Sequence, residues 1–295
     1  MERILFILNP VAGGGKAKAL RSLIEEIMDK YNREYDLLLT SKPGEATCIA
    51  EKSVNDYEII VAVGGDGTVN EVAIGLINKN KGSLGIIPGG TGNDLAKSLD
   101  ISLDPKEALE TLCRGLKRDI DIGNVNGSNF LNISSVGFDA EVVINNVEIK
   151  KKIKSRISYA ISVVYTLFNF KMKRIQINID DKILDEEIML LAVGNGKYYG
   201  GGMKILPMAK VDDGYFDICV VSGVSKIKTL FLFPSIFKGN HVRYHKYVRI
   251  FKAKTVKIKV EEGIYLNIDG DVKFRDKEII FTIEDKRLSV ICEKK

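Results

Sequence analysis

The chain has 295 residues, of which 45% are hydrophobic and 28% charged, a composition that excludes disordered and fibrous proteins and leaves room for two domains. The net charge of +5 is unevenly distributed, because residues 1–125 hold 15 basic and 19 acidic residues and residues 126–295 hold 29 and 20. The basic second part favours an anionic partner, and the absence of nucleic-acid-binding motifs argues against nucleic acid.

The sequence lacks the features of a membrane-spanning or exported chain. No stretch reaches the roughly 20 apolar residues of a transmembrane helix, and the N-terminal apolar run has no signal-peptide cleavage site. The four cysteines, Cys48, Cys113, Cys219 and Cys292, lack disulfide or metal spacing and are predicted to be reduced, and all but Cys113 are predicted to lie in the core. We therefore expect a cytoplasmic protein.

The first 100 residues repeat one pattern four times: a short apolar run, a glycine-rich turn and a segment with helical spacing. The predicted strands are residues 3–9, 35–40, 58–63 and 84–87. The predicted helices are residues 16–31, 46–54, 68–78 and 92–99, with a further helix at 105–116. This alternation predicts a doubly wound α/β domain with a parallel sheet, whose ligands bind at the carboxyl ends of the strands.

The second part of the chain has the period of β-strands. Apolar residues alternate with polar ones in six short runs, at residues 129–136, 174–179, 189–193, 215–221, 255–260 and 279–283. Many short strands separated by turn residues predict a β-sandwich or a flattened barrel. Helical stretches are expected near residues 150–170 and 225–238.

Two glycine-rich loops carry the strongest signal for phosphate binding. Residues 64–68, Gly-Gly-Asp-Gly-Thr, separate a buried strand from a helix, where glycines and the first helical amides favour an anion. Asp66 indicates a bridging Mg²⁺, because a bare carboxylate would repel phosphate. Residues 88–94 repeat the construction with Thr91 and Asp94, so Asp66 and Asp94 are predicted to share a metal ion. A tight turn with an exposed aspartate is the alternative.

Residues 9–18 form a third glycine-rich loop that fits neither the P-loop nor the dinucleotide-binding pattern, and a simple turn is the alternative. In order and spacing, residues 9–13, 64–71 and 88–94 resemble the motifs of the bacterial diacylglycerol kinase and lipid kinase family, which is related to sphingosine kinases and NAD kinases. The resemblance implies a nucleotide-binding domain of residues 1–125 with a returning strand at about 285–295. It also implies a lipid-binding β-sandwich of residues 126–284.

The resemblance implies an ATP- and Mg²⁺-dependent kinase that converts diacylglycerol to phosphatidic acid. Two other enzymes are alternatives: a kinase of another lipid alcohol, such as phosphatidylglycerol or a sphingoid base, and a kinase of a soluble substrate such as NAD. A lipid- or nucleotide-binding regulator that keeps the fold without catalysis is the alternative outside enzymes. The residues that would bind ATP and its metal lie in or beside the three loops: Asn9, Pro10, Val11, Ala12, Gly13, Thr40, Gly64, Gly65, Asp66, Gly67, Thr68, Val69, Asn70, Glu71, Thr91 and Asp94.

Residues 209–217 are similar to a structural Mg²⁺ site of the same family. The resemblance implies that the ion is held by the carbonyl groups of Lys210 and Tyr215 and by the carboxylate of Asp213. The Asp-Asp-Gly sequence at 212–214 is also typical of an ordinary turn.

Residues 267–271, Asn-Ile-Asp-Gly-Asp, are the candidate source of the catalytic base. A lipid hydroxyl needs a base to accept its proton, and the family has a glutamate where this chain has Asp271. Asp269 is the neighbouring candidate, and both are expected to point the same way along one strand. A polar hairpin turn without a catalytic role is the alternative.

Clustered basic residues favour association with anionic lipid. Lys150, Lys151, Lys152, Lys154 and Arg156 precede the apolar segment 157–170, and a second basic stretch covers residues 238–259. We expect peripheral association with the inner face of the membrane, with a solvated basic face as the alternative. The resemblance makes a homodimer plausible. His241 and His245 are expected at the surface or beside a phosphate, without an assigned role.

Overall fold

The computed structural model describes residues 2–15, 19–153, 157–275 and 277–293. Within it the chain forms two compact units. Unit 1 contains Met1–Ile122, Gly200–Gly202 and Glu284–Lys295, and unit 2 contains Gly123–Tyr199 and Met203–Ile283. The sequence did not predict that residues 200–202 would belong to unit 1. Lys154, Arg156 and the start of the predicted helix 16–31 lie outside the described residues.

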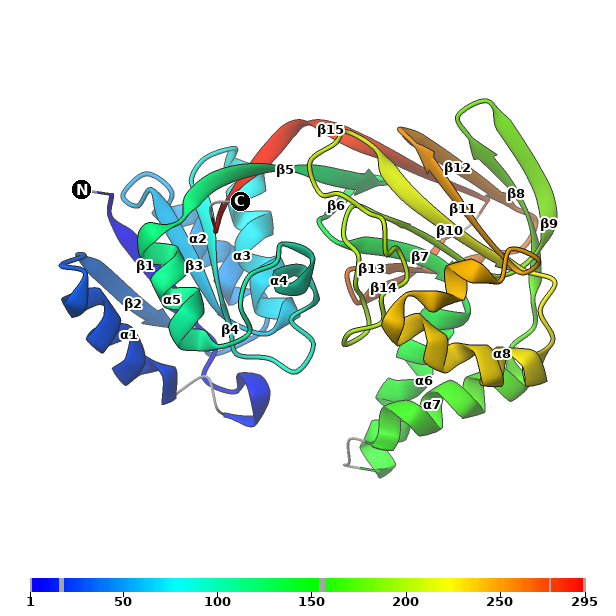
Figure 1. Ribbon diagram of the computed structural model, residues 1–295, viewed down its shortest axis with the longest axis horizontal. Helices are drawn as coiled ribbons and strands as arrows, with labels where there is room; N and C mark the ends of the chain where they lie inside the picture. Colours follow the sequence, from blue (N-terminus) through cyan, green and yellow to red (C-terminus); the bar gives the residue numbers. More distant parts are fainter. Residues whose placement is uncertain (1, 16–18, 154–156, 276, 294–295) are drawn as a thin grey trace. The chain divides into compact units, whose positions relative to one another are not determined.

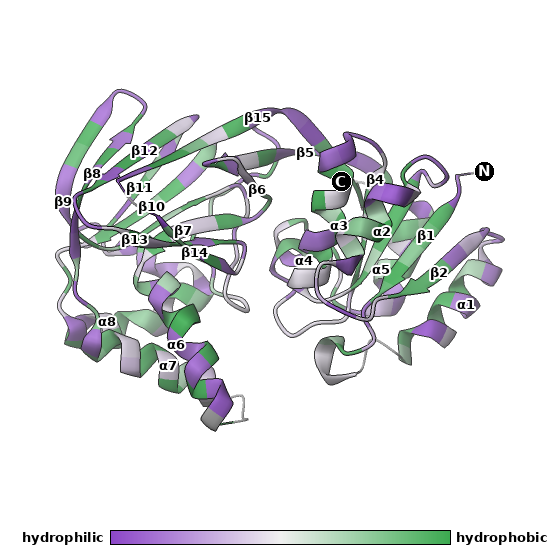
Figure 2. Ribbon diagram, turned by 180° about the vertical axis from the view of Figure 1, so that it is seen from behind, coloured by the Kyte–Doolittle hydropathy of each residue, from purple (hydrophilic) through white to green (hydrophobic). Residues whose placement is uncertain are grey.

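Unit 1 is built on a parallel sheet (Figure 1). Its strands are β1 (Ile4–Leu8), β2 (Tyr35–Leu39), β3 (Ile59–Gly64) and β4 (Ser83–Pro88), in the spatial order β2-β1-β3-β4. The end of β15 (Glu278–Cys292) adds a further parallel strand beside β4. Every residue of β1, β3 and β4 is buried, which explains their continuous apolar sequences (Figure 2).

Helices cover the sheet of unit 1 in two pairs. Helix α1 (Leu20–Lys30) packs against α5 (Pro105–Arg114), and α2 (Glu45–Ser53) packs against α3 (Asp66–Lys79). A 3₁₀ turn, η1 (Ala12–Gly14), follows β1, and the short α4 (Asp94–Ser98) follows β4. The predicted doubly wound α/β fold is confirmed.

Unit 2 is the predicted β-sandwich. Its strands are β5 (Leu116–Val125), β6 (Ser128–Phe130), β7 (Ile133–Gly137), β8 (Lys173–Ile179), β9 (Lys182–Gly194), β10 (Phe216–Ser222), β11 (Val248–Ala253), β12 (Thr255–Val260), β13 (Ile264–Ile268), β14 (Asp271–Arg275) and the first part of β15. Strand β9 joins the two layers, because its first half pairs with β8 and its second half with β7 and β10.

The sandwich core follows the alternation of strand side chains. Along β10, Phe216 and Ile218 face the interior of the sandwich, whereas Cys219 packs in a second cluster with Leu206. Phe130 stacks on Phe216 with ring centroids 5.7 Å apart. One layer is therefore buried on both faces, which explains why β9 ends in a continuous apolar run.

Helices of unit 2 lie together beside the sandwich (Figure 1). They are α6 (Phe138–Lys152), α7 (Ile157–Asn169), α8 (Lys226–Leu232) and the 3₁₀ helices η3 (Phe233–Lys238) and η4 (Asn240–Arg243). Within the described part of the chain, none of the helices combines the length and the apolar character needed to cross a membrane.

Two sequence expectations about single residues were wrong. His241 is buried rather than at the surface, and its Nε2 pairs with the carbonyl oxygen of Ile205 at 2.9 Å. Burial lowers the pKa of His241 below its usual value. Cys48 is exposed rather than in the core, although all four cysteines are free as predicted.

Candidate active site

The glycine-rich loop after β3 leads directly into α3. Helix α3 starts at Asp66, and its first intrahelical bond joins the N–H of Val69 to the carbonyl of Gly65 at 3.1 Å. The N–H groups of Asp66, Gly67 and Thr68 therefore belong to the first turn, which has no intrahelical acceptors for them. These groups and the helix dipole make this helix start suited to bind a phosphate group.

Asp66 holds the neighbouring loop in place. Its Oδ2 accepts a hydrogen bond from the N–H of Asn93 at 2.8 Å, and its Oδ1 accepts one from the N–H of Asp94 at 2.5 Å. Asn93 has a positive φ of 52° and also accepts from the N–H of Gly90 at 3.1 Å. The carboxylate of Asp66 thus connects the loop after β3 to the loop after β4.

Asp94 is buried beside Asp66 and is bound by two groups. Its Oδ2 accepts from the N–H of Gly201 at 2.7 Å, and its Oδ1 lies 3.4 Å from the ammonium of Lys97. Burial, followed by the negative charge of Asp66, raises the pKa of Asp94. Two close carboxylates with one nearby ammonium carry an excess of negative charge, which favours a bound cation. The predicted Mg²⁺ site at Asp66 and Asp94 stays a prediction, and the charges around it support it.

Glycine is required where the two loops meet. A Cβ atom on Gly90 would lie 2.3 Å from the Cα atom of Gly65, and one on Gly64 would lie 2.6 Å from Oγ1 of Thr68. In contrast, a Cβ atom on Gly67 would meet nothing within 4 Å. The backbones of the two loops are in direct contact, which only residues without side chains allow.

Asn9, at the end of β1, connects the first loop to α3. Its Nδ2 donates to Oγ1 of Thr68 at 3.1 Å, and its Oδ1 accepts from the N–H of Val11 at 3.2 Å. Strands β2 and β3 flank β1 on opposite sides, so the chain order of the sheet reverses between β1 and β3. Ligands of open α/β sheets bind at the carboxyl ends of the strands at such a reversal.

The remaining residues predicted to bind ATP lie around the same end of the sheet. Thr40 is buried after β2, and Thr91 is exposed in the loop after β4. The carboxylate of Glu71 instead accepts from the N–H groups of Gly44 and Ala46 at 2.9 and 3.2 Å. Glu71 therefore supports the start of α2, and its predicted contact with ATP stays a prediction.

The expectation that Asp269 and Asp271 share one strand was wrong. Strand β13 ends at Ile268 and β14 begins at Asp271, with Asp269 and Gly270 forming the turn at φ values of 46° and 99°. Positive φ at both central residues is typical of a two-residue hairpin, the alternative interpretation of this motif.

The two aspartates of this hairpin, both in unit 2, have different surroundings. The carboxylate of Asp269 accepts from the N–H groups of Leu131, Asn132 and Ile133 at 2.7, 3.1 and 2.9 Å. Asp271 has a side chain that is 69% exposed, with the ammonium of Lys273 at 3.5 Å. Asp269 therefore fixes the hairpin to β7, and Asp271 presents a carboxylate to solvent.

A second candidate cation site in unit 2 centres on Asp213. Its Oδ1 accepts from the N–H of Tyr215 at 3.2 Å, and its Oδ2 pairs with the ammonium of Lys252 at 2.5 Å. Nearby, the buried Oδ2 of Asp217 has no hydrogen-bond partner among the described residues. Burial raises the pKa of Asp217, and the charge of Asp213 adds to this effect. Mg²⁺ prefers oxygen ligands, and this oxygen of Asp217 and the nearby carboxylate of Asp213 are both of that kind.

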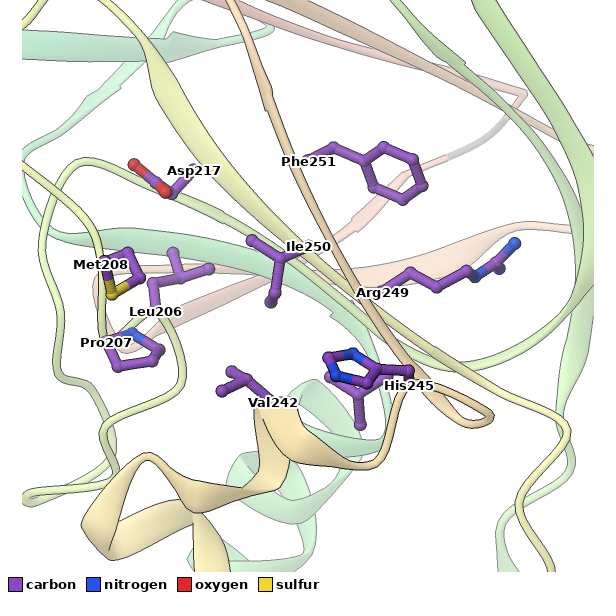
Figure 3. Close-up of a pocket in the computed structure, with 10 residues that line it drawn as sticks. Leu206, Pro207, Met208, Asp217, Val242, His245, Arg249, Ile250 and Phe251 are labelled. Atoms are coloured by element: carbon purple, nitrogen blue, oxygen red, sulfur yellow. The ribbon is translucent and has the colours of Figure 1, made fainter.

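Unit 2 also contains an open groove of about 490 Å³ beside β10 and β11 (Figure 3). The groove is mainly apolar, and the Asp217 carboxylate and the His245 ring lie at opposite ends of it. None of the residues predicted to bind ATP or metal, or to act as the base, lines this groove. We assign it no role in the reaction.

Gly201 and Lys97 bind Asp94 and were not among the residues predicted from the sequence. Gly200, Gly201 and Gly202 all have positive φ values, so they form a turn that other residues would strain. The triple glycine itself was the available signal. Among the described residues, no group of three or more His, Cys, Asp or Glu side chains is placed to hold a metal ion.

Comparisons with known proteins cover both units. The model of the diacylglycerol kinase catalytic domain matches residues 3–125, and the model of the YegS C-terminal NAD kinase beta sandwich-like domain matches residues 132–291. A diacylglycerol kinase of Bacillus subtilis is 31% identical over 277 residues, covering 92% of this chain and 90% of that protein.

Solved structures agree with this similarity. The crystal structure of a putative diacylglycerol kinase from Bacillus anthracis has a TM-score of 0.83 and 29% identity, covering 99% of this chain and 97% of that one. An NAD kinase from Archaeoglobus fulgidus, solved in complex with ATP, has a TM-score of 0.52 and 13% identity, covering 99% and 94%. The latter likeness shows a shared fold alone.

Proposed function

This chain belongs to the diacylglycerol kinase family and is a kinase, and from that premise we propose that it transfers the γ-phosphoryl group of ATP to the hydroxyl of diacylglycerol, giving phosphatidic acid. The observation that carries the proposal is the start of α3, where first-turn N–H groups lie in a glycine-rich loop at the carboxyl end of β3. The choice of lipid rests on the names of relatives that match 92% of this chain.

In this proposal unit 1 binds the phosphates of ATP mainly through its backbone. The amides of Asp66, Gly67 and Thr68 would donate to phosphate oxygens, and the exposed hydroxyl of Thr91 would add a side-chain donor. The hydrogen bonds of Asp66 keep the second loop in place before ATP binds. Phosphoryl transfer depends chiefly on such positioning and on stabilisation of the developing negative charge.

We propose Asp271 as the base that accepts the proton of the lipid hydroxyl. Three backbone N–H groups already hold the carboxylate of Asp269, and moving it would break the anchor of the hairpin. The largely exposed carboxylate of Asp271 is available to a substrate. A positioned carboxylate of this kind accelerates proton transfer by about 10²- to 10⁴-fold.

Magnesium has two proposed positions. Asp66 and Asp94 would hold the ion that accompanies ATP, and the carboxylate of Asp213 with the carbonyls of Lys210 and Tyr215 would hold a structural ion. When bound, the first ion would neutralise phosphate charge. Without it, Asp66 and Asp94 still fix the two loops through their hydrogen bonds.

The proposed substrate lies in a bilayer, so the protein must reach a membrane surface. We propose that it is cytoplasmic and associates peripherally with the inner face of the membrane. The basic excess of residues 126–295, with 29 basic and 20 acidic residues, supports attraction to anionic lipid.

Labelled phosphate transfer from ATP tests the proposal. Mixed micelles would contain diacylglycerol, phosphatidylglycerol or a sphingoid base in separate reactions, and NAD would serve as a soluble acceptor. Label in phosphatidic acid is the expected result. Label in another lipid would replace the substrate, and label in NAD alone would contradict lipid kinase activity.

A further inference from the structure

Helix α7 buries several polar side chains and exposes several apolar ones, which is unusual for a surface helix. Its side against α6 carries Ser158, Ser162 and Thr166, all buried. The Nδ2 of Asn145 donates to Oγ1 of Thr166 at 2.9 Å, and the hydroxyl of Ser162 donates to Oδ1 of Asn146 at 3.2 Å. The contact between α6 and α7 is therefore partly polar, whereas a surface helix normally turns its polar side to water.

The outer side of α7 is apolar and exposed. It presents Ile161, Val164, Tyr165 and Phe168, spaced three and four residues apart, and Phe168 is 59% exposed. Other apolar residues of α7, such as Leu167, already pack in the cluster against the sandwich. The exposed set is thus additional to the residues that the fold uses, and it is unsuited to water.

Helix α8 and η3 extend this pattern. Their exposed apolar residues are Ile227, Leu230, Phe231 and Phe237, and Phe231 is 78% exposed. Neither α8 nor η3 contains a buried residue. Helices α7 and α8 contact one another, and the ammonium of Lys226 donates to the carbonyl of Phe168 at 2.6 Å. We call these eight exposed residues of α7, α8 and η3 the α7–α8 apolar face.

The chain segments that form this face are basic, and the exposed Glu148 of the neighbouring α6 is paired with Lys151 at 2.6 Å. Residues 157–179 contain three basic residues and no acidic residue, and residues 218–260 contain ten basic residues and no acidic residue. Lys171, Lys226, Lys228 and Lys238 are exposed beside or within the helices that form the face. Exposed apolar side chains on chain segments whose charged residues are all basic match the boundary of an anionic bilayer, where headgroups are negative and acyl chains lie beneath them.

We propose that the α7–α8 apolar face inserts into the surface of an anionic lipid bilayer, with α7 lying along the boundary between headgroups and acyl chains. The inference rests on the proposed function for its biological purpose, since a lipid kinase must reach a substrate in the bilayer. A second copy of this chain is the less favoured occupant, because two such faces would bring cations of the same sign together.

Vesicle co-sedimentation tests the inference without requiring catalysis. Phe168→Ser combined with Phe231→Ser removes one exposed aromatic ring from each helix. The matched control is Ile183→Ser, because Ile183 on β9 is 66% exposed and lies outside the face. Wild type and the control are expected to bind vesicles of equimolar phosphatidylglycerol and phosphatidylcholine, and the double variant about 100-fold more weakly. Thermal unfolding would show that all three are folded.

Three further measurements distinguish the outcomes. Binding of wild type to pure phosphatidylcholine vesicles should be much weaker, because the cations lose their partner. Equal vesicle binding by the double variant would overturn the inference, as would a change from dimer to monomer with vesicle binding retained. Vesicle binding through this face by a protein that phosphorylates no lipid would support the inference and contradict the proposed function.

Discussion

Units 1 and 2 place their functional groups in different ways. In unit 1 the candidate phosphate site consists of backbone N–H groups in loops, and Asp66 and Asn9 serve mainly to hold those loops. In unit 2 the candidate base and the α7–α8 apolar face are exposed side chains on a hairpin and on helices. Substitutions in the loops of unit 1 should therefore lower activity or stability by displacing the loop backbone. Substitutions in unit 2 should remove the chemical function of a single side chain.

Asp66→Asn should have the largest effect. An asparagine offers one acceptor oxygen to two N–H groups, so the contact between the loops loses a hydrogen bond and its charge. We expect kcat for lipid phosphorylation to fall about 10³-fold. Asp56→Asn, at an exposed position of unit 1, is the charge-matched control and should leave kcat unchanged. Similar activities for the two variants would refute the role given to Asp66.

Asp271→Asn and Asp269→Asn should separate catalysis from stability. Loss of the base at Asp271 should lower kcat by about 10²-fold or more and leave the unfolding midpoint unchanged. Asp269→Asn keeps a residue that tolerates positive φ but weakens three hydrogen bonds, which should cost about 1–3 kcal/mol in urea unfolding. The reverse pattern, with Asp271→Asn unstable and active, would exchange the two roles.

Gly90→Ala tests whether loop geometry controls unit 1. The added Cβ atom would collide with the backbone of Gly65, and we expect a loss of about 1–3 kcal/mol in the free energy of unfolding. Gly67→Ala meets nothing within 4 Å and should not destabilise the protein. Equal urea midpoints for the two variants would show that the loops are not in close contact.

His241 gives the smallest predicted effect. Burial lowers its pKa in the folded state, so the unfolded chain binds more protons once the pH falls below the usual histidine value of about 6.5. The free energy of unfolding is therefore highest above that pH and decreases as the pH falls, with a slope of at most about 1.4 kcal/mol per pH unit from this one group. Urea unfolding of His241→Gln at several pH values should show a shallower dependence than wild type.

The sequence predicts unit 1 better than unit 2 for a physical reason. A strand, a glycine-rich turn and a helix are local in the chain, so residues 64–68 reveal their structure and their chemistry together. The exception within unit 1 is the bond between Asp94 and Gly201, which joins residues 107 apart: the triple glycine at 200–202 indicates a turn, but it does not indicate which residue the turn contacts. The exposure of Phe168 and Phe231 likewise depends on which side of each helix packs, which the apolar run at 157–170 does not reveal.

The hairpin at 269–270 shows a second reason why a prediction from sequence can fail. Its Asp-Gly pair is typical of a two-residue turn, yet its similarity to a catalytic motif favoured a continuous strand with two parallel carboxylates. The three N–H groups that bind Asp269 come from residues 131–133, far away in the sequence. Tertiary contacts, rather than the motif, distinguish the roles of Asp269 and Asp271.

Hydrogen–deuterium exchange on the full chain tests most directly whether unit 1 binds ATP and the α7–α8 apolar face of unit 2 binds lipid. A non-hydrolysable ATP analogue should protect backbone amides in peptides covering residues 64–70 and 88–94, and phosphatidylglycerol vesicles should protect residues 157–169 and 226–238. The ATP analogue alone should not change exchange in residues 157–169 and 226–238, and the vesicles alone should not change exchange in residues 64–70 and 88–94. Protection of 157–169 by the analogue, or no protection of 64–70, would contradict the account.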